Sequence, residues 1–301
     1  MRIEILARRW GGPEGGPDGM AVACAFLAFT LAELGHEVRG YFGDKPAPAW
    51  GHPRIAWRHN PALIMPDDWL ADLVVSTSQP TWRRTAAAAA EADARGRLVY
   101  WHHHSDVPPG YDCLLAAPPV VEGTPDGFVR RAVLPPSSWA VEAGGPRGGE
   151  EVLVPGAGVA KGGHVARAVA WRCPDLGWYV LRGRCSGEDL LAWSSIPSAT
   201  IAPGPMPPAT FLGRARAVLA PTRFEVHPLT LVEAAVRGIP VVCSDLPGCR
   251  AALRSSARYV PPAAPAEAWQ EALRAALGGR PRPLRLRPYR ESVSRALEAL
   301  S

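Results

Sequence analysis

Lysine is nearly absent from this chain of 301 residues, whose 33 basic residues comprise two lysines and 31 arginines. Where the composition favours arginine so strongly, a lysine at a motif position suggests that a compact ammonium group is required there. The net charge is +5, but no basic run is dense enough to argue for a nucleic-acid partner. A positive background of this size favours an anionic substrate.

Paired metal-binding cysteines, long apolar runs and a D-x-D motif are also missing. The six cysteines have no paired spacing, and several lie in apolar runs, as reduced thiols of a core do. The opening MRIEILARRWGG has no long apolar stretch, and the longest apolar segment, residues 20–32, is too short to span a bilayer. We therefore expect a cytoplasmic protein with no transmembrane segment, no metal site and no bound cofactor.

The length and the order of the apolar segments predict an α/β protein of two domains. A hydrophobic content of 47% with 20% charged residues is typical of a globular protein. A chain of 301 residues exceeds what one hydrophobic core usually supports. Short apolar strands alternate with helices in both halves, which favours doubly wound parallel sheets. The glycine-rich stretch 143–150 is the best linker candidate. The expected strands are 2–7, 36–41, 73–76, 98–101, 151–155, 177–182, 200–201, 217–220, 240–243 and 259–260, and the expected helices are 20–34, 82–94, 163–172, 208–216, 228–237, 266–277 and 289–300.

The most informative segment is residues 221–248, PTRFEVHPLTLVEAAVRGIPVVCSDLPG, which sets Glu225 and Glu233 eight positions apart. Pro228 suits the first position of a helix and Gly238 the position just past its end. Backbone N–H groups at a helix N-terminus form an anion site. Those that we expect to point unpaired from this helix belong to Leu229, Thr230 and Leu231. An acidic side chain beside an anion site repels the anion unless it binds something else, such as hydroxyls, so the pattern suits a ligand with both phosphate and sugar.

This segment resembles the E-x7-E signature of retaining glycosyltransferases of family four, and GIPVVCSDLPG is similar to their G-x-P-V-V-A-S-D-x-x-G strand and loop. Residues 18–38 are similar to the family's glycine-rich opening, with Asp18 and Gly19 at the two glycine positions. Lys161 and Gly162 resemble the end of its G-R-x-x-x-x-K-G loop.

The resemblance implies the GT-B fold, in which two Rossmann-like doubly wound domains face a central cleft. The N-terminal domain, residues 1–146, would bind the acceptor and would be completed by the C-terminal helix, 288–301. The C-terminal domain, residues 147–287, would bind a nucleotide-sugar donor.

The resemblance also implies roles for individual residues. Glu233 would hold the ribose hydroxyls, and Glu225 would lie nearer the donor sugar. Lys161 and the helix N-terminus would stabilise the leaving diphosphate. Gly16 and Asp18 would lie on the acceptor and sugar side. The expected catalytic residues are His103, Glu225 and Lys161, and the expected donor-binding residues are Gly19, Lys161, Gly183, Glu225, His227, Pro228, Leu229, Thr230, Leu231 and Glu233.

A run of three histidines, within the sequence WHHHSD, ends a predicted strand at residues 101–106. Strand ends form the floor of ligand crevices in doubly wound sheets. Neighbouring residues of a strand point to opposite faces, so three adjacent histidines cannot share one metal without distortion. We therefore favour a sugar site, with His103 facing the donor sugar and His102 as the other choice; a purely structural role is the alternative.

The chain departs from the family pattern at several positions. Gly156 stands where the family has the arginine of its basic loop, His227 and Pro228 replace the usual F-G, and Ala251 replaces a frequent glutamate. The candidates for the missing charge are Arg182, Arg184, Arg223 and His227. From the sequence we expect that an arginine restored at position 156 would tighten diphosphate binding if the loop tolerates a side chain there.

The activity implied is hexosyltransferase-like: a sugar moves from a nucleoside-diphosphate sugar to a hydroxyl or amine, without a metal and with retained anomeric configuration. The sequence does not distinguish the bases, and a small-molecule or natural-product acceptor is preferred over a polymer. One alternative is a catalytically weak, nucleotide-sugar-binding partner of an active enzyme. Another is a sugar-nucleotide epimerase or a glycogen-phosphorylase relative, although no lysine suitable for pyridoxal phosphate lies near the C-terminal end.

Overall fold

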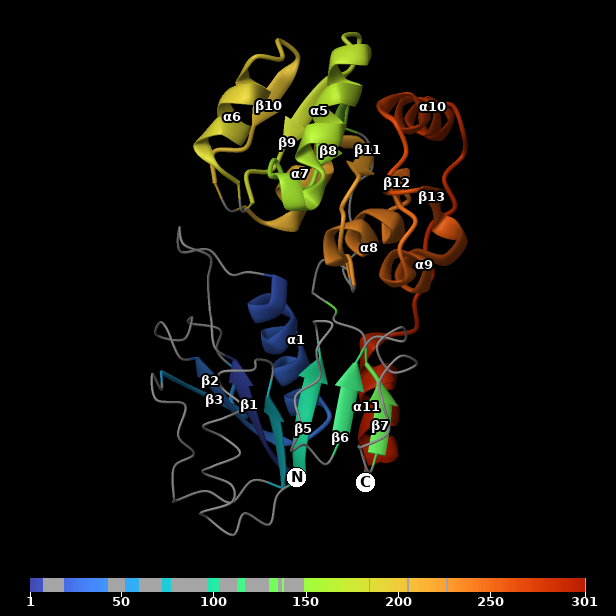
Figure 1. Cartoon of the computed structure of the whole chain (residues 1–301). Coiled ribbons are helices and arrows are strands. Elements are labelled where there is room, and N and C mark those ends of the chain that lie inside the picture. The colour runs from blue at the N-terminus through green and yellow to red at the C-terminus, as the bar shows by residue number, and fades with distance from the viewer. Residues whose placement is uncertain are drawn as a thin grey trace. The chain divides into compact units, whose positions relative to one another are not determined.

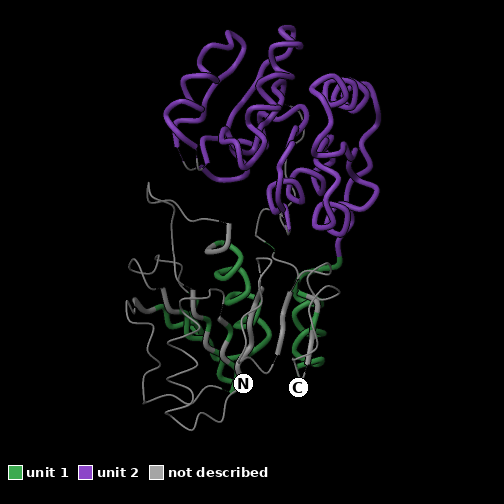
Figure 2. The backbone as a smooth tube through the Cα atoms, viewed as in Figure 1, with its two compact units in different colours: residues 1–138, 287–301 green, residues 139–286 purple. Residues whose placement is uncertain are grey.

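The computed structural model describes residues 1–7, 19–42, 52–59, 72–76, 97–102, 113–116, 130–134, 137, 149–183, 185–204, 206–225 and 227–300 (Figure 1). The chain divides into two compact units (Figure 2). The N-terminal unit comprises Met1–Ser138 with Arg287–Ser301, and the C-terminal unit comprises Trp139–Leu286. The sequence predicts these divisions after residues 146 and 287 instead.

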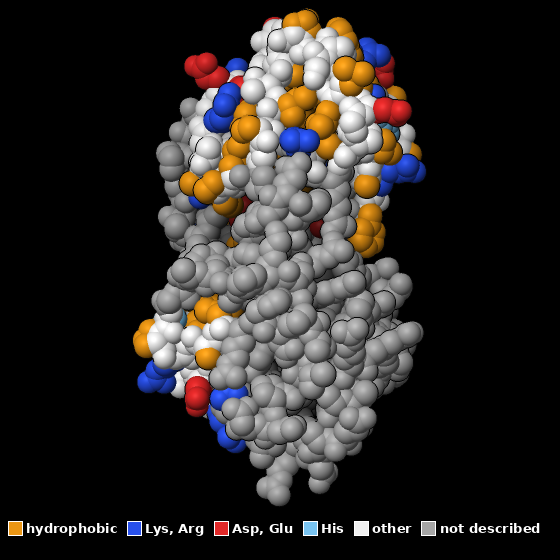
Figure 3. All heavy atoms as spheres, turned by 90° about the vertical axis from the view of Figure 1, so that its left-hand side faces the viewer, with side chains coloured by type: hydrophobic (Ala, Val, Ile, Leu, Met, Phe, Trp, Pro, Cys, Tyr) orange, Lys and Arg blue, Asp and Glu red, His pale blue; other side chains and the backbone are white. Residues whose placement is uncertain are grey.

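The described surface is mixed in character. On the face shown in Figure 3, basic, acidic and hydrophobic side chains are interspersed, and the described basic side chains do not gather into one continuous patch. None of the helices in the described part of the chain is long and apolar enough to cross a membrane.

The N-terminal unit holds a seven-stranded parallel sheet with the order β3-β2-β1-β4-β5-β6-β7. The strand order reverses between β1 and β4, as in a doubly wound sheet. The bounds are β1 Arg2–Ala7, β2 Glu37–Phe42, β3 Ile55–His59, β4 Leu73–Ser76, β5 Arg97–His102, β6 Cys113–Ala116 and β7 Arg130–Val133. Strands β3, β6 and β7 were not expected from the sequence; β3 and β7 contain arginine, which interrupts the apolar run that predicts a buried strand.

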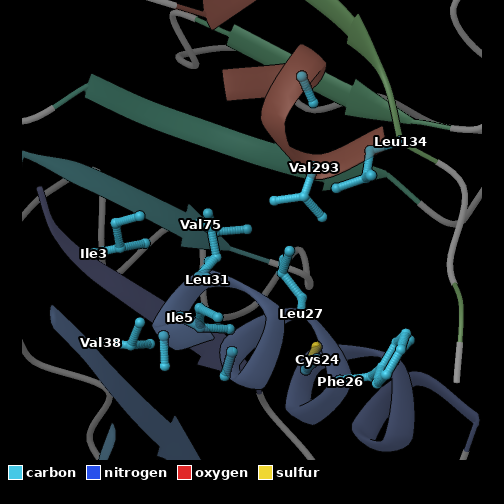
Figure 4. Packing of buried hydrophobic residues seen from close by; sticks show 14 of the residues in the cluster. Ile3, Ile5, Cys24, Phe26, Leu27, Leu31, Val38, Val75, Leu134 and Val293 are labelled. Atoms are coloured by element: carbon cyan, nitrogen blue, oxygen red, sulfur yellow. The ribbon is translucent and has the colours of Figure 1, made fainter. Parts of the chain in front are cut away.

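Two helices from opposite ends of the chain share one core in this unit. They are α1, Gly19–Glu33, and α11, Tyr289–Leu300. The rings of Phe26 and Tyr289 stack with their centroids 5.0 Å apart. Leu27 of α1 and Val293 of α11 line a small apolar cavity together with strand residues (Figure 4). The last helix of the chain therefore completes the hydrophobic core of the N-terminal unit.

The C-terminal unit holds a six-stranded parallel sheet with the order β10-β9-β8-β11-β12-β13. Its strands are β8 Glu151–Val154, β9 Gly177–Val180, β10 Ala199–Ile201, β11 Ala215–Ala220, β12 Val241–Ser244 and β13 Ala257–Val260. Its helices are α5 Gly163–Arg172, α6 Gly187–Ser194, α7 Pro208–Gly213, α8 Leu229–Val236, α9 Pro247–Leu253 and α10 Ala266–Leu277, with 3-10 turns η1 Val159–Lys161 and η2 Arg254–Ser256.

Both faces of this sheet are buried, which explains why its strands are apolar throughout. Val152 and Val154 of β8 point into a core shared with α5, α6 and α10. Leu153, between them, points into the opposite core, shared with α7, α8 and α9. The prediction of doubly wound α/β units with parallel sheets is therefore confirmed.

Three helical details differ from the sequence expectation. Helix α7 ends at Gly213 and not at residue 216, and α8 begins at Leu229 with Pro228 as its N-cap. Helices α6 and α9 were missed. A signal for α6 was present, because Ser186 and Asp189 form a capping box at its N-terminus.

We predict that Trp269→Ala lowers the free energy of unfolding of the C-terminal unit by about 3–5 kcal/mol. Trp269 of α10 is completely buried, so the truncation leaves a cavity. Trp171 of α5 is 56% exposed, and Trp171→Ala should change stability by no more than about 0.5 kcal/mol. Urea unfolding followed by circular dichroism measures both, and equal losses would contradict the placement of the two side chains.

Candidate functional site

Two loops of the C-terminal unit meet where the strand order of the sheet reverses. Strands β8 and β11 are hydrogen-bonded neighbours, and the later strands extend from them in opposite directions. The loop after β8 contains Lys161, and the loop after β11 contains Glu225. In doubly wound sheets, ligands bind in the crevice outside the carboxyl ends of the strands at such a reversal.

Backbone contacts hold these loops together. The N–H of Arg223 donates to the carbonyl of Ala160 at 3.4 Å. Gly162 has a left-handed φ of 74°, and a Cβ there would collide with the carbonyl oxygen of Pro221. Glycine therefore allows the lysine loop to approach the backbone of the glutamate loop. The glutamate loop is itself anchored, because the Ser244 hydroxyl donates to the Thr222 carbonyl at 2.6 Å.

An ion pair joins the two loops: the Lys161 Nζ lies 2.7 Å from Oε2 of Glu225. The lysine side chain is 50% exposed and the glutamate side chain 19% exposed. An ion pair of this exposure contributes about 0–1 kcal/mol to stability. The structure thus brings together two of the three expected catalytic residues, at a place where their charges are accessible to a ligand.

Gly156 makes room for Lys161. A Cβ at position 156 would lie 2.9 Å from Cβ of Lys161 and 3.1 Å from its Cγ. Both atoms are close to the lysine backbone, so a side chain at position 156 would displace the η1 turn itself. This packing bears on the condition of our expectation, because the loop accommodates a side chain at position 156 only if the lysine turn moves.

Gly183, one of the expected donor-binding residues, lies next to this loop. Gly183 has a left-handed φ of 57°, and a Cβ placed on it would be 3.7 Å from Cα of Gly156. The two chain segments that follow β8 and β9 therefore run close together through their glycines.

The N-terminus of α8 differs from the expected anion site. The N–H of Leu229 donates to the His227 carbonyl at 3.0 Å, and that of Leu231 donates to the Pro228 carbonyl at 2.9 Å. The prediction that both groups are unpaired is wrong, because the first turn closes tightly on the residues before the helix. Among the described residues, no backbone acceptor is found for the N–H of Thr230.

The second glutamate of the motif, Glu233, lies within α8 and is only 2% exposed. Arg237, one helical turn further along, is 5% exposed. Nothing in the local sequence pattern indicates that this arginine is buried, so it could not be found from the sequence.

Of the expected site residues from the N-terminal unit, the structure describes some and not others. Gly19 is the first residue of α1 and His102 the last residue of β5. Gly16, Asp18 and His103 lie outside the described residues.

The candidates for the missing charge can be placed by exposure. Arg223 is exposed, Arg182 and His227 are half-buried, and Arg184 lies outside the described residues. Among the described residues, no three His, Cys, Asp or Glu side chains are grouped as metal ligands would be.

Comparison with known families now bears on the site. Residues 182–278 match the family model "Glycosyl transferases group 1". This match lies within the C-terminal unit. The matched residues include Gly183 and both glutamates of the E-x7-E motif, whereas Lys161 precedes them. Comparison with curated proteins gives no match.

Solved structures of glycosyltransferases share the fold along almost the entire chain. Sucrose-phosphate synthase from Thermosynechococcus elongatus matches with a TM-score of 0.70 and 15% identity, covering 98% of this chain and 94% of its own. AviGT4, a glycosyltransferase involved in avilamycin A biosynthesis, matches with a TM-score of 0.64 and 19% identity. The match covers 98% of this chain and 92% of AviGT4. WaaG, a glycosyltransferase involved in lipopolysaccharide biosynthesis, matches with a TM-score of 0.59 and 14% identity. The match covers 98% of this chain and 95% of WaaG. The fold is GT-B, and with the group 1 domain it makes the chain a transferase of the glycosyltransferase type.

We predict that Gly156→Ala destabilises the C-terminal unit by about 1–3 kcal/mol, because its methyl group forces the η1 turn to move. Gly213, the last residue of α7, is the matched control, since nothing lies within 4 Å of a Cβ placed on it. Gly213→Ala should be neutral or stabilise by up to about 1 kcal/mol. Thermal unfolding compares the two variants, and an unchanged midpoint for Gly156→Ala would contradict the close packing on Lys161.

Proposed function

We propose that this chain is a retaining, hexosyltransferase-like enzyme that moves a sugar from a nucleoside-diphosphate sugar to an acceptor hydroxyl or amine. The observation that carries the proposal is the ion pair between Lys161 and Glu225 at the reversal point of the sheet. The group 1 domain and the GT-B fold support sugar transfer, and the family resemblance of the E-x7-E motif supports retention.

The two charges of the ion pair match those that develop during the reaction. As the bond between the sugar and the diphosphate breaks, positive charge develops on the sugar ring and negative charge on the leaving oxygens. The Lys161 ammonium would stabilise the leaving diphosphate, and the Glu225 carboxylate would lie nearer the sugar. Fixed charges of this kind act most strongly in a closed, dry site. In the ligand-free protein the charges of Lys161 and Glu225 neutralise each other.

Other groups complete the proposed site. Glu233 would accept hydrogen bonds from the ribose hydroxyls, and His103 would face the donor sugar. The N–H of Thr230 is the group of the α8 N-terminus best placed to meet a phosphate. A metal is not required in this mechanism, because the ammonium group supplies the positive charge.

The acceptor is proposed to be a small molecule or natural product, bound by the N-terminal unit. Support comes from AviGT4, which is involved in the biosynthesis of avilamycin A. A cytoplasmic location and the absence of a bound cofactor stay predictions from the sequence.

A second candidate function is a nucleotide-sugar-binding protein with little transferase activity of its own. The observation that favours it is Gly156, which leaves Lys161 as the one cation of the family's basic loop. Such a protein would assist an active partner.

A donor screen separates these possibilities. Free UDP, GDP and ADP and their sugar derivatives are added to the protein, and the midpoint of thermal unfolding and the release of free sugar are measured. A transferase is stabilised by its donor and slowly hydrolyses it, whereas a binding protein is stabilised without turnover. An epimerase converts the donor sugar into its epimer. No stabilisation by any of these compounds would reject the proposal.

We predict that Glu233→Ala weakens binding of the stabilising nucleoside diphosphate by roughly ten- to hundredfold. Loss of a hydrogen bond to a charged group is worth about 1.5–3 kcal/mol. Isothermal titration calorimetry measures the affinity, and the exposed Glu298, changed to alanine, is the control. Equal affinities for Glu233→Ala and the unsubstituted protein would reject the role of Glu233.

Lys161→Ala should lower turnover more than it lowers binding of the nucleoside, because the diphosphate gains charge only as it leaves. Lys161→Arg should restore part of the loss, since it keeps the charge but differs in shape. Donor hydrolysis rates and nucleoside affinities are compared across the three proteins. Full activity of Lys161→Ala would mean that a group other than Lys161 binds the diphosphate.

A further inference from the structure

Glu233 and Arg237 form a buried pair of opposite charges on α8. Glu233 is 2% exposed and Arg237 5% exposed. Residues four apart on a helix are neighbours on one face, and the order of acid before base is the favourable one. Helical side chains incline toward the N-terminus, which favours an extension of the Arg237 side chain toward Glu233.

The charge of each partner depends on the other. A carboxylate buried without a cation tends to take up a proton and become neutral. Burial lowers the pKa of Arg237, and the negative charge of Glu233 acts in the opposite direction. Since a guanidinium stays protonated in proteins, Arg237 supplies a permanent positive charge, and such a charge favours the ionised form of a neighbouring carboxylate.

The end of α8 holds Arg237 in place. Gly238, with a left-handed φ of 70°, ends the helix directly after it. The N–H of Leu284 donates to the carbonyl of Ala235 at 2.9 Å, and that of Ile239 donates to the carbonyl of Ala234 at 3.0 Å. These contacts tie the last turn of the helix to the chain segments around it, so the arginine is carried on a rigid element.

We propose that Arg237 is a positioning residue that holds Glu233 as an oriented carboxylate for the two hydroxyls of a ribose. This inference rests on the proposed function of the site. An ionised carboxylate has about four acceptor positions. A guanidinium occupies two of them at most, which leaves acceptors for both hydroxyls. The site then distinguishes a ribonucleotide from a 2′-deoxyribonucleotide, which offers one hydroxyl fewer.

The experiment compares affinities for UDP and 2′-deoxy-UDP, or for the GDP or ADP pair if that nucleotide binds better. The unsubstituted protein should prefer the ribonucleotide by roughly ten- to hundredfold, the worth of one hydrogen bond to a charged group. Glu233→Gln should remove most of this preference. Arg237→Met, which keeps the length of the stem without the charge, should remove it to the same extent. Arg237→Lys should retain part of the preference, because it keeps the charge but binds at one point rather than in a fork.

Three controls separate positioning from folding. Glu233→Gln/Arg237→Met leaves no buried charge at the pair, and it should show no loss of preference beyond that of Glu233→Gln alone. Arg280→Met, at an exposed arginine of the same unit, should keep the full preference. If Arg237→Met does not fold, Arg237→Lys provides the test. An undiminished preference of Arg237→Lys for the ribonucleotide would overturn the proposal.

The outcomes distinguish this inference from the proposed function. If Glu233→Gln loses the ribose preference and Arg237→Met keeps it, Arg237 has no positioning role and the inference is overturned. If the unsubstituted protein binds none of the nucleotides, or binds the ribo and deoxy forms equally, the proposed function of Glu233 fails first. A parallel loss in Glu233→Gln and Arg237→Met, with partial rescue by lysine, supports the inference.

Discussion

The parallel pairing of β8 with β11 is the constraint on which the site of the C-terminal unit depends. The two strands are far apart in sequence, yet Val152 lies opposite Ala217 and Leu153 opposite Val218. At the start of the strands, Arg214 binds Glu151 in a bidentate pair, with its Nε 2.6 Å from Oε2 and Nη2 2.9 Å from Oε1. At their carboxyl ends the two loops meet. Lys161 and Glu225 come together because the strands that carry their loops are neighbours.

Small residues decide how closely these loops approach. Gly162 lets the backbone of one loop lie against the carbonyl of the other, and Gly156 leaves room for the stem of Lys161. The family resemblance presents Gly156 as the loss of an arginine. The structure adds that the space next to it is partly filled by the remaining lysine. A substitution of Gly156 by arginine would therefore add a cation and also move the ammonium group of Lys161.

Helix α8 connects the part of the proposed donor site that would bind phosphate with the part that would bind the ribose. Its N-terminal turn borders the loop of Glu225, and its buried face carries Glu233 and Arg237. The first turn satisfies two of the three N–H groups that seemed available for a phosphate. In the proposed site, more of the phosphate charge would therefore be left to Lys161, and the carboxylate proposed to bind the ribose hydroxyls, Glu233, has a buried arginine one helical turn away.

Local sequence determined much of this protein. Apolar runs alternating with helices predicted parallel doubly wound sheets, and the E-x7-E segment singled out Glu225 and Glu233 by its spacing and its flanking residues. Strands β3 and β7 escaped prediction because their arginines interrupt the apolar run that predicts a buried strand. Only the tertiary structure decided that Lys161 pairs with Glu225 and that Arg237 is buried one helical turn from Glu233. The physical reason is that periodicity, caps and motifs act over a few neighbouring residues, whereas burial and ion pairing depend on which strands become neighbours in the sheet.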